Sequence, residues 1–223
     1  MRFVGIHSSD AAGQIIASHI AESLANGPVV WLLSGGSAIA PQVAAAQLLT
    51  QQSLALDRLT VTLIDERYGE PGHANSNWTQ LESAGFKIPG AQMLPVLVAN
   101  QPPAAVAQRW WSRLEPVLQN GTSIGVLGIG PDYHIAGIKP DSPATRSTES
   151  VCAYEWSDYS RITLTASALQ QLDHIWLYAM GPSKWPVIEH LETSNNSLTS
   201  EPGQLLKQWS QATILTDRPE AIA

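Results

Sequence analysis

Short apolar runs alternate along the chain with longer segments whose apolar residues recur at every third or fourth position. Val29–Leu33 is apolar throughout, which is typical of a strand buried on both faces of a sheet. Ile16, Ile20 and Leu24 recur at the spacing of one helix face. Because strand and helix patterns alternate, the sequence predicts an α/β fold with an open, mostly parallel sheet and helices on both faces.

The pattern gives approximate bounds for each element, and residues 1–223 are expected to form one domain because no linker or repeat interrupts it. The expected strands are Arg2–Ile6, Val29–Leu33, Leu59–Ile64, Ser123–Gly128, Arg161–Thr165, His174–Met180 and Ala212–Thr216. The expected helices are one capped by Asp10 and ended by Asn26-Gly27, one through Val43 to Leu49, one starting near Trp78 and capped by Asn75 or Asn77, one from Pro102 to about Leu118, and the short helices Ser167–Leu172 and Ser183–Leu191. Pro140–Ser160 is irregular and is expected to be a lid or a long β excursion.

Polar motifs follow several of the predicted strands at the point where each strand ends. In an open parallel sheet, ligands collect beyond the carboxyl ends of the strands. Ser34-Gly35-Gly36-Ser37 follows one strand, and its glycines and the next helix start suit an anion such as phosphate, although a plain tight turn is an equal alternative. The motif has neither the Walker nor the dinucleotide spacing, so a nucleotide site is not supported.

Charge is concentrated in the motif Asp65-Glu66-Arg67, which follows another strand. The guanidinium of Arg67 suits a phosphate or a carboxylate, and Asp65 would then face the substrate; the alternative is an exposed turn with a local ion pair. After the strand Ser123–Gly128, a glycine-containing loop carries Asp132 and His134. Histidine is the usual general base near neutral pH and a nearby carboxylate can orient it, so catalysis is favoured over a structural role for this pair.

The overall charge limits which partners are plausible. The chain has 12 Lys and Arg against 19 Asp and Glu, a formal net charge of −7, and charged residues make up 14% of it. A nucleic-acid binder normally needs a basic face, so that class is excluded. Arg161 at a strand start and Lys184 at a helix start are either solvated surface cations or members of one anion site. Lys184 opposes the helix dipole, which favours an anion nearby.

Other functional classes receive little support from the sequence. The single cysteine, Cys152, is expected to be a small packed residue. No signal-peptide pattern opens the chain and no apolar run approaches the length of a membrane span, so a soluble, cytoplasmic protein is expected. No histidine or cysteine pair has the spacing of a zinc site, so no metal is expected.

Taken in order, these motifs resemble those of the 6-phosphogluconolactonases, in the superfamily that they share with the glucosamine-6-phosphate isomerases/deaminases. The resemblance covers nearly the whole chain and rests on Leu33–Ser37, Asp65-Glu66-Arg67-Tyr68 with Ser76-Asn77, Gly128–Asp132 with His134 and Pro140, Arg161–Thr165, Gly181 with Lys184, and the last strand to Asp217. It implies a Rossmann-like fold and a sugar-phosphate site without metal, nucleotide or other cofactor. The expected partner is a small sugar phosphate, with no nucleic acid and no membrane, and the expected state is a monomer or weak homo-oligomer.

The resemblance also implies a role for each matching residue in hydrolysing 6-phosphoglucono-δ-lactone to 6-phosphogluconate, a step of the pentose phosphate pathway. His134 would be the general base that activates water, and Asp132 would support it. Asp65 would line the sugar pocket and Arg67 would lie near the phosphate or the lactone end. The phosphate would be bound by Ser34, Gly35, Gly36, Ser37, Arg161 and Lys184.

Four positions depart from the family pattern in the predicted catalytic loop, whose usual sequence is Asp-Gly-His-Thr-Ala-Ser. Tyr133 stands where the family has glycine, Ile135 and Gly137 lack the usual hydroxyls, and Lys139 replaces an apolar residue. A tyrosine at position 133 changes the backbone if that position needs a positive φ. Two alternatives therefore stay open: a sugar-phosphate-binding protein with impaired catalysis, and an amino-sugar-phosphate isomerase/deaminase that uses Asp65 to move a proton.

Overall fold

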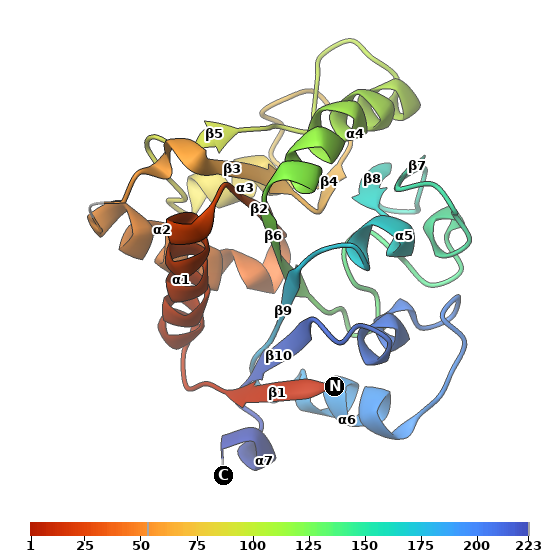
Figure 1. Cartoon of the computed structure of the whole chain (residues 1–223). Helices are drawn as coiled ribbons and strands as arrows, with labels where there is room; N and C mark the ends of the chain where they lie inside the picture. The colour runs from red at the N-terminus through yellow and green to blue at the C-terminus, as the bar shows by residue number, and fades with distance from the viewer. Residues whose placement is uncertain (53, 223) are drawn as a thin grey trace.

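A seven-stranded sheet lies at the centre of the computed structural model, which describes residues 1–52 and 54–222 (Figure 1). Its order is β1-β10-β9-β6-β2-β3-β5, and each neighbouring pair of these strands is parallel. The strands are β1 Arg2–Gly5, β2 Val29–Leu33, β3 Leu59–Leu63, β5 Gln92–Met93, β6 Thr122–Gly128, β9 His174–Ala179 and β10 Ala212–Thr216. The predicted α/β class with a mostly parallel sheet is confirmed.

Helices cover both faces of this sheet, as expected. The chain moves through the sheet in one direction from β2 to β3 to β5, and in the other from β6 to β9 to β10. Because such crossovers are right-handed, the two series place their helices on opposite faces, and Figure 1 shows α1 and α2 across the sheet from α4 and α6. The helices are α1 Ser9–Asn26, α2 Ile39–Gln51, α3 Asn77–Ser83, α4 Pro103–Asn120, α5 Ala166–Leu169, α6 Trp185–Thr193 and α7 Pro219–Ile222.

The two directions of winding separate at the neighbouring strands β2 and β6. The connection after β2 leads to α2 on one face, whereas the chain after β6 proceeds toward the opposite edge. The loops at the carboxyl ends of these two strands therefore diverge and leave a crevice, which is where ligands bind in open α/β sheets. The segments 34–37 and 129–137 both begin at this crevice.

A second, three-stranded antiparallel sheet stands beside the first and was not anticipated from the sequence. Its order is β4-β8-β7, with β4 Asp65–Arg67, β8 Arg161–Leu164 and β7 Val151–Tyr154. Asp65–Arg67, expected to follow a strand as a polar motif, is thus a short strand of its own. The sequence left two expectations for Pro140–Ser160, a lid or a β excursion. β7 lies within this segment, which agrees with the β excursion.

Two helix caps and one helix start differ from the expected ones, while α4 and α5 start within one residue of the expected positions. Ser8, and not Asp10, caps α1, because its Oγ accepts the N–H of Ala11 at 3.1 Å. Ser76, and not Asn75 or Asn77, caps α3 through the N–H of Thr79 at 3.2 Å. The helix expected from Ser183 begins at Trp185, since a turn follows Gly181, whose φ is +98°. Local composition suggests several possible caps, and at α3 a tertiary contact supports one of them, because the Ser76 hydroxyl also donates to Glu66 at 2.8 Å.

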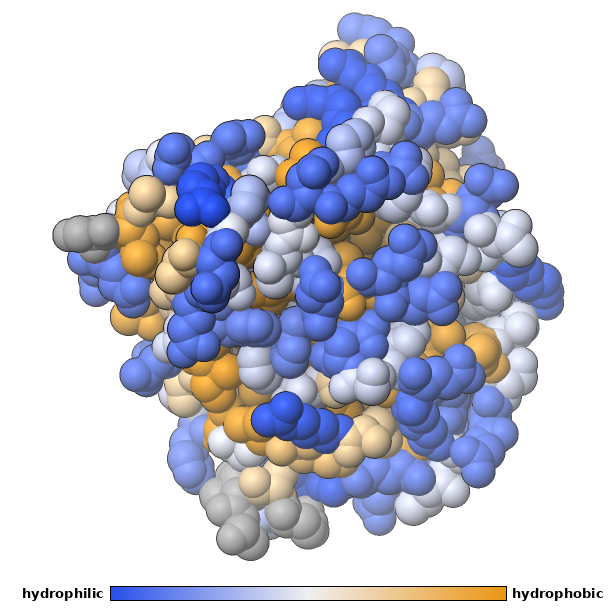
Figure 2. All heavy atoms as spheres, viewed as in Figure 1, coloured by the Kyte–Doolittle hydropathy of each residue, from blue (hydrophilic) through white to orange (hydrophobic). Residues whose placement is uncertain are grey.

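The exterior is largely hydrophilic on the face shown in Figure 2, with apolar residues in scattered patches. Within the described residues, no helix is long and apolar enough to cross a membrane. One partly open region lies on the α1 side of β9, where the rings of His19, His174 and Trp176 pack together. The His19 and His174 rings are 4.6 Å apart and the His174 and Trp176 rings 4.2 Å apart, measured between centroids.

The histidine at the centre of this cluster is predicted to make stability depend on pH. Burial, together with the charges of His19 and Arg2, lowers the pKa of His174 to about 4. The unfolded chain, where the pKa of histidine is about 6.5, therefore binds more protons between pH 6.5 and 4, so that stability falls as pH falls through this window. We expect His174→Phe, which keeps an aromatic ring, to gain stability relative to the unsubstituted protein as pH falls from 6.5 to 4. Urea unfolding of both proteins at several pH values measures this; a constant difference would contradict it.

Candidate functional site

A cavity of about 290 Å³ opens at the crevice between the carboxyl ends of β2 and β6. Segments from both sheets form its wall, including the loop after β2, the strands β4 and β8, the loop after β6, and the turn before α6. The lining residues are Ser34, Gly35, Gly36, Ser37, Asp65, Arg67, Asn77, Gly128, Ile129, Gly130, Pro131, His134, Ala136, Arg161 and Lys184. The structure thus brings together nine of the ten site residues expected from the sequence, and the tenth, Asp132, contacts His134.

The loop after β2 lies against α3 so closely that only glycine fits at one position. A Cβ at Gly35 would lie 2.1 Å from Oδ1 of Asn77, and Gly36 has a φ of +63°. The side chain of Gln42 in α2 holds the loop start, donating to the Ser34 carbonyl at 2.7 Å and accepting the Ser34 N–H at 2.8 Å. The hydroxyl oxygen of Ser34 is buried and has no hydrogen-bond partner within the described structure, so it can bind a ligand.

Two arginines lie opposite each other on neighbouring strands of the small sheet. Arg67 of β4 and Arg161 of β8 are directly paired in the antiparallel register, and like charges in that position repel. Asp158 binds Arg161 through Nη2 at 2.7 Å, and Arg67 donates from Nη1 to the Asn75 carbonyl at 3.1 Å. The Nε atoms of both arginines are buried and lack partners among the described residues. An anion in the cavity would relieve the repulsion and supply those partners.

Two more charged side chains complete the wall of the cavity. Asp65 is buried, which raises the pKa of its carboxyl, while the charges of Arg161, His134 and Arg67 oppose that rise. Lys184 donates from Nζ to the Ile129 carbonyl, and partial burial lowers its pKa against the opposing charge of Asp132. Three of the 12 basic residues of this acidic chain therefore line one cavity.

Asn77 lines the cavity, whereas the sequence suggested it as a helix cap and as part of the family motif, and not as a site residue. Its Nδ2 donates to the Asp65 carbonyl at 2.9 Å and to Oδ2 of Asp65 at 3.3 Å, while its Oδ1 is buried without a partner in the described part of the chain. Glu66 holds it in place by accepting the Asn77 N–H at 2.7 Å and the Ser76 hydroxyl at 2.8 Å. The carboxylate of Glu66 therefore stabilises the start of α3 and is not part of the cavity wall.

The loop after β6 carries the pair Asp132 and His134 on an unusual backbone. Tyr133 and Ala136 have positive φ values of +62° and +51°, so the loop reverses direction on both sides of His134. Glycine is required at position 130, because a Cβ there would lie 2.1 Å from Nδ1 of His134 and 2.4 Å from Oδ1 of Asp132. The loop is closed by the Gly130 N–H, which donates to the His134 carbonyl at 2.9 Å.

The ionisation of Asp132 determines which nitrogen of His134 is free. Burial opposes ionisation, but contacts with His134 and Lys139 outweigh it and hold the pKa of the Asp132 carboxyl well below its ordinary value. An ionised carboxylate only accepts hydrogen bonds, so the close contact between its Oδ1 and Nδ1 of His134 places a proton on Nδ1. Nζ of Lys139 lies 3.1 Å from the other oxygen, Oδ2, and 3.0 Å from Nδ1 of His134. An ammonium group only donates hydrogen bonds, so with a proton on Nδ1 the partner of Lys139 is Oδ2 of Asp132. Neutral His134 in this tautomer has an unprotonated Nε2, which can accept a proton.

No metal centre can be assigned. Among the side chains that the structure describes, no group of three or more His, Cys, Asp or Glu residues is placed to hold a metal ion.

Residues 7–215 match the family described as glucosamine-6-phosphate isomerases/6-phosphogluconolactonase. The chain belongs to this family. A 6-phosphogluconolactonase of Mycobacterium tuberculosis is 29% identical over 193 residues, covering 78% of this chain and 77% of the relative. A glucosamine-6-phosphate deaminase of Bacillus pumilus is 25% identical over 238 residues, covering 98% of both chains. The crystal structure of a 6-phosphogluconolactonase from Shewanella baltica superposes with a TM-score of 0.81 at 23% identity over 97% of each chain, which shows the shared fold.

The opposed arginines predict that inorganic phosphate binds in the cavity and stabilises the protein. A ligand that binds only the folded state raises the unfolding temperature, and the gain grows with ligand concentration. We expect phosphate to raise the unfolding temperature of the unsubstituted protein, and Arg161→Gln to remove most of this shift. Differential scanning calorimetry across a phosphate series measures both. Arg109→Gln, which alters an exposed arginine of α4, is the matched control. An equal shift in all three proteins would place the anion elsewhere.

Proposed function

We propose that this protein hydrolyses 6-phosphoglucono-δ-lactone to 6-phosphogluconate. The observation that carries the proposal is that one cavity is lined both by His134, oriented by Asp132, and by three cations. Lactone hydrolysis needs a base to activate water and positive charge to bind the phosphate of the substrate. Membership of the family and the named lactonase relatives support the same activity.

Under this proposal, each group of the cavity has a role. The phosphate binds at Ser34–Ser37 with Arg161 and Lys184, where buried donors lack partners. Arg67 lies near the phosphate or the lactone end, and Asp65 lines the sugar pocket. His134 accepts a proton from water at Nε2 while Asp132 holds the Nδ1 proton and stabilises the imidazolium that forms.

The role of His134 predicts a large loss of activity when the imidazole is removed. General-base catalysis contributes roughly 10²–10⁴-fold, so we expect His134→Ala to lower kcat by that order while KM changes little. A pH-stat assay on freshly prepared lactone, corrected for spontaneous hydrolysis, measures this. His7→Ala, which removes an exposed histidine outside the cavity, serves as the control.

The outcome of this assay also separates the alternatives. If the protein accelerates hydrolysis and His134→Ala equals it, His134 is not the base. If the protein binds 6-phosphogluconate by calorimetry without accelerating hydrolysis, it is a sugar-phosphate-binding protein with impaired catalysis.

A second candidate function is isomerisation and deamination of glucosamine 6-phosphate. It is supported by Asp65, a buried carboxylate in the cavity wall whose pKa is raised by desolvation, as suits a group that moves a proton between carbons. The Bacillus pumilus deaminase, which aligns with 98% of this chain, also points that way.

The two activities predict different products from different substrates. If the second function holds, glucosamine 6-phosphate releases ammonia and Asp65→Asn abolishes the release. If lactone hydrolysis is present and no ammonia forms, the second function is excluded.

A further inference from the structure

The loop that carries His134 contains a tyrosine in a backbone conformation that glycine usually adopts. Tyr133 has a φ of +62°, in the left-handed region that a side chain with a Cβ disfavours. Tyr133 immediately precedes His134, so its backbone angles set the direction in which the imidazole leaves the loop. Something outside the loop must therefore hold this conformation.

Two contacts with the segment after β9 hold Tyr133. Its ring stacks on the imidazole of His190 in α6, with 4.5 Å between ring centroids and 29° between their planes. Its carbonyl accepts the Gly203 N–H at 2.7 Å, where a side chain would not fit because a Cβ at 203 would lie 2.9 Å from that oxygen. Neither His190 nor Gly203 lines the cavity.

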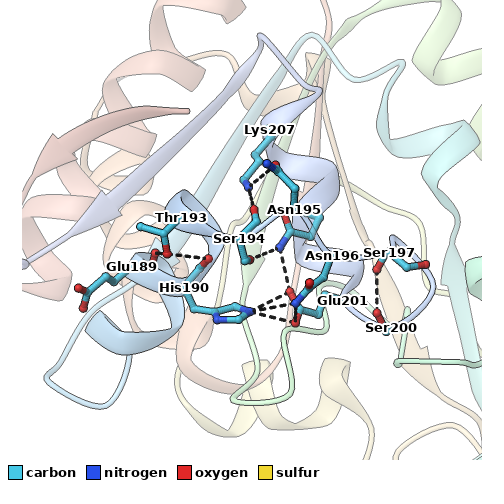
Figure 3. Close-up of polar contacts among 11 residues, drawn as sticks. Glu189, His190, Thr193, Ser194, Asn195, Asn196, Ser197, Ser200, Glu201 and Lys207 are labelled. Atoms are coloured by element: carbon cyan, nitrogen blue, oxygen red, sulfur yellow. Dashed lines mark hydrogen bonds and ion pairs between the residues drawn. The ribbon is translucent and has the colours of Figure 1, made fainter.

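A buried carboxylate fixes the imidazole on which Tyr133 stacks. Nε2 of His190 lies 2.9 and 3.1 Å from the two carboxylate oxygens of Glu201, which is only 8% exposed (Figure 3). Asn196 donates to one of these oxygens at 2.6 Å and Gln204 to the other at 2.8 Å. Each carboxylate oxygen thus has a partner other than His190, so the carboxylate and the ring next to it are held in one orientation.

We propose that Tyr133, His190 and Glu201 form a brace that positions His134 for catalysis. The ring stack and the Gly203 hydrogen bond keep Tyr133 at its positive φ, and this keeps Nδ1 of His134 against Asp132. All three are positioning residues, because none lines the cavity. The inference rests on the proposed function, since it assigns these residues to the base of that reaction.

The brace is tested by a double-mutant cycle. We expect Tyr133→Ala and His190→Ala each to lower kcat about tenfold to a hundredfold with little change in KM, because misplacement of a base by about an ångström costs that much. The double variant should lose no more than the worse single variant. Tyr133→Phe should keep kcat, since it retains the ring, and His190→Ala should lower kcat in that background as in the original one.

Glycine at position 133 provides the matched control. Glycine adopts the positive φ without a brace, so His190→Ala should leave kcat unchanged in the Tyr133→Gly background. If His190→Ala lowers kcat equally in the tyrosine and glycine backgrounds, or changes only KM, the brace is refuted. The glycine background also keeps the test valid if Tyr133→Ala fails to fold.

A spectroscopic readout separates failure of the brace from failure of the proposed function. The ¹⁵N chemical shifts of the His134 ring report the proton on Nδ1, whatever reaction the protein performs. We expect this tautomer to dominate in the unsubstituted protein and to lose population in His190→Ala. If no lactone is hydrolysed but the tautomer shifts as expected, the proposed function fails and the brace stands. Hydrolysis with an unchanged tautomer and full kcat in His190→Ala overturns the brace alone.

Discussion

The repulsion between Arg67 and Arg161 is the constraint on which the arrangement of the site depends. The antiparallel register of β4 and β8 places the two arginines opposite each other, and Lys184 lines the same small cavity. The chain as a whole carries a net charge of −7, which disfavours polyanions. Local geometry nevertheless places three basic side chains, those of Arg67, Arg161 and Lys184, around one small cavity. Asp158 and Asp65 offset part of this charge and leave the Nε atoms of both arginines unpartnered within the described residues.

The same small sheet also links the two arginines to the loop that carries His134. Thr163 of β8 pairs with Asp65 of β4 and accepts the Gly137 N–H at 3.0 Å through its Oγ1. A Cβ at Gly137 would lie 2.8 Å from Cβ of Thr163, so the glycine that replaces the family's serine allows close contact between loop and sheet. The departure at position 137 therefore has a structural reason. The close contact between the loop at Gly137 and β8 at Thr163 brings His134 and the two arginines to the same cavity.

The sequence predicted those strands and helices whose residues form a recognisable local pattern of apolar and polar positions. Six of the seven strands of the main sheet match their expected bounds within one residue. Burial on both faces leaves a run of apolar residues that marks such strands, as in Val29–Leu33. The second sheet was missed because Asp65–Arg67 becomes a strand only by pairing with Arg161, far away in the sequence. Asn77 was missed as a lining residue for a similar reason, since its contact with Asp65 depends on where α3 starts. The convergence of the predicted site residues could be anticipated, because parallel strands end at one edge.

Tyr133 illustrates how a departure from the family pattern can be accommodated at a distance. Judged by the loop alone, a tyrosine in place of glycine disfavours the positive φ that the turn adopts. The structure retains that φ and provides contacts from His190 and Gly203, which lie 57 and 70 positions further along the chain. Substitutions at a catalytic loop and at a supporting helix are then energetically coupled, so neither can be assessed singly. The sequence of the loop is therefore insufficient to decide whether His134 is correctly placed, because the residues that support it belong to another part of the fold.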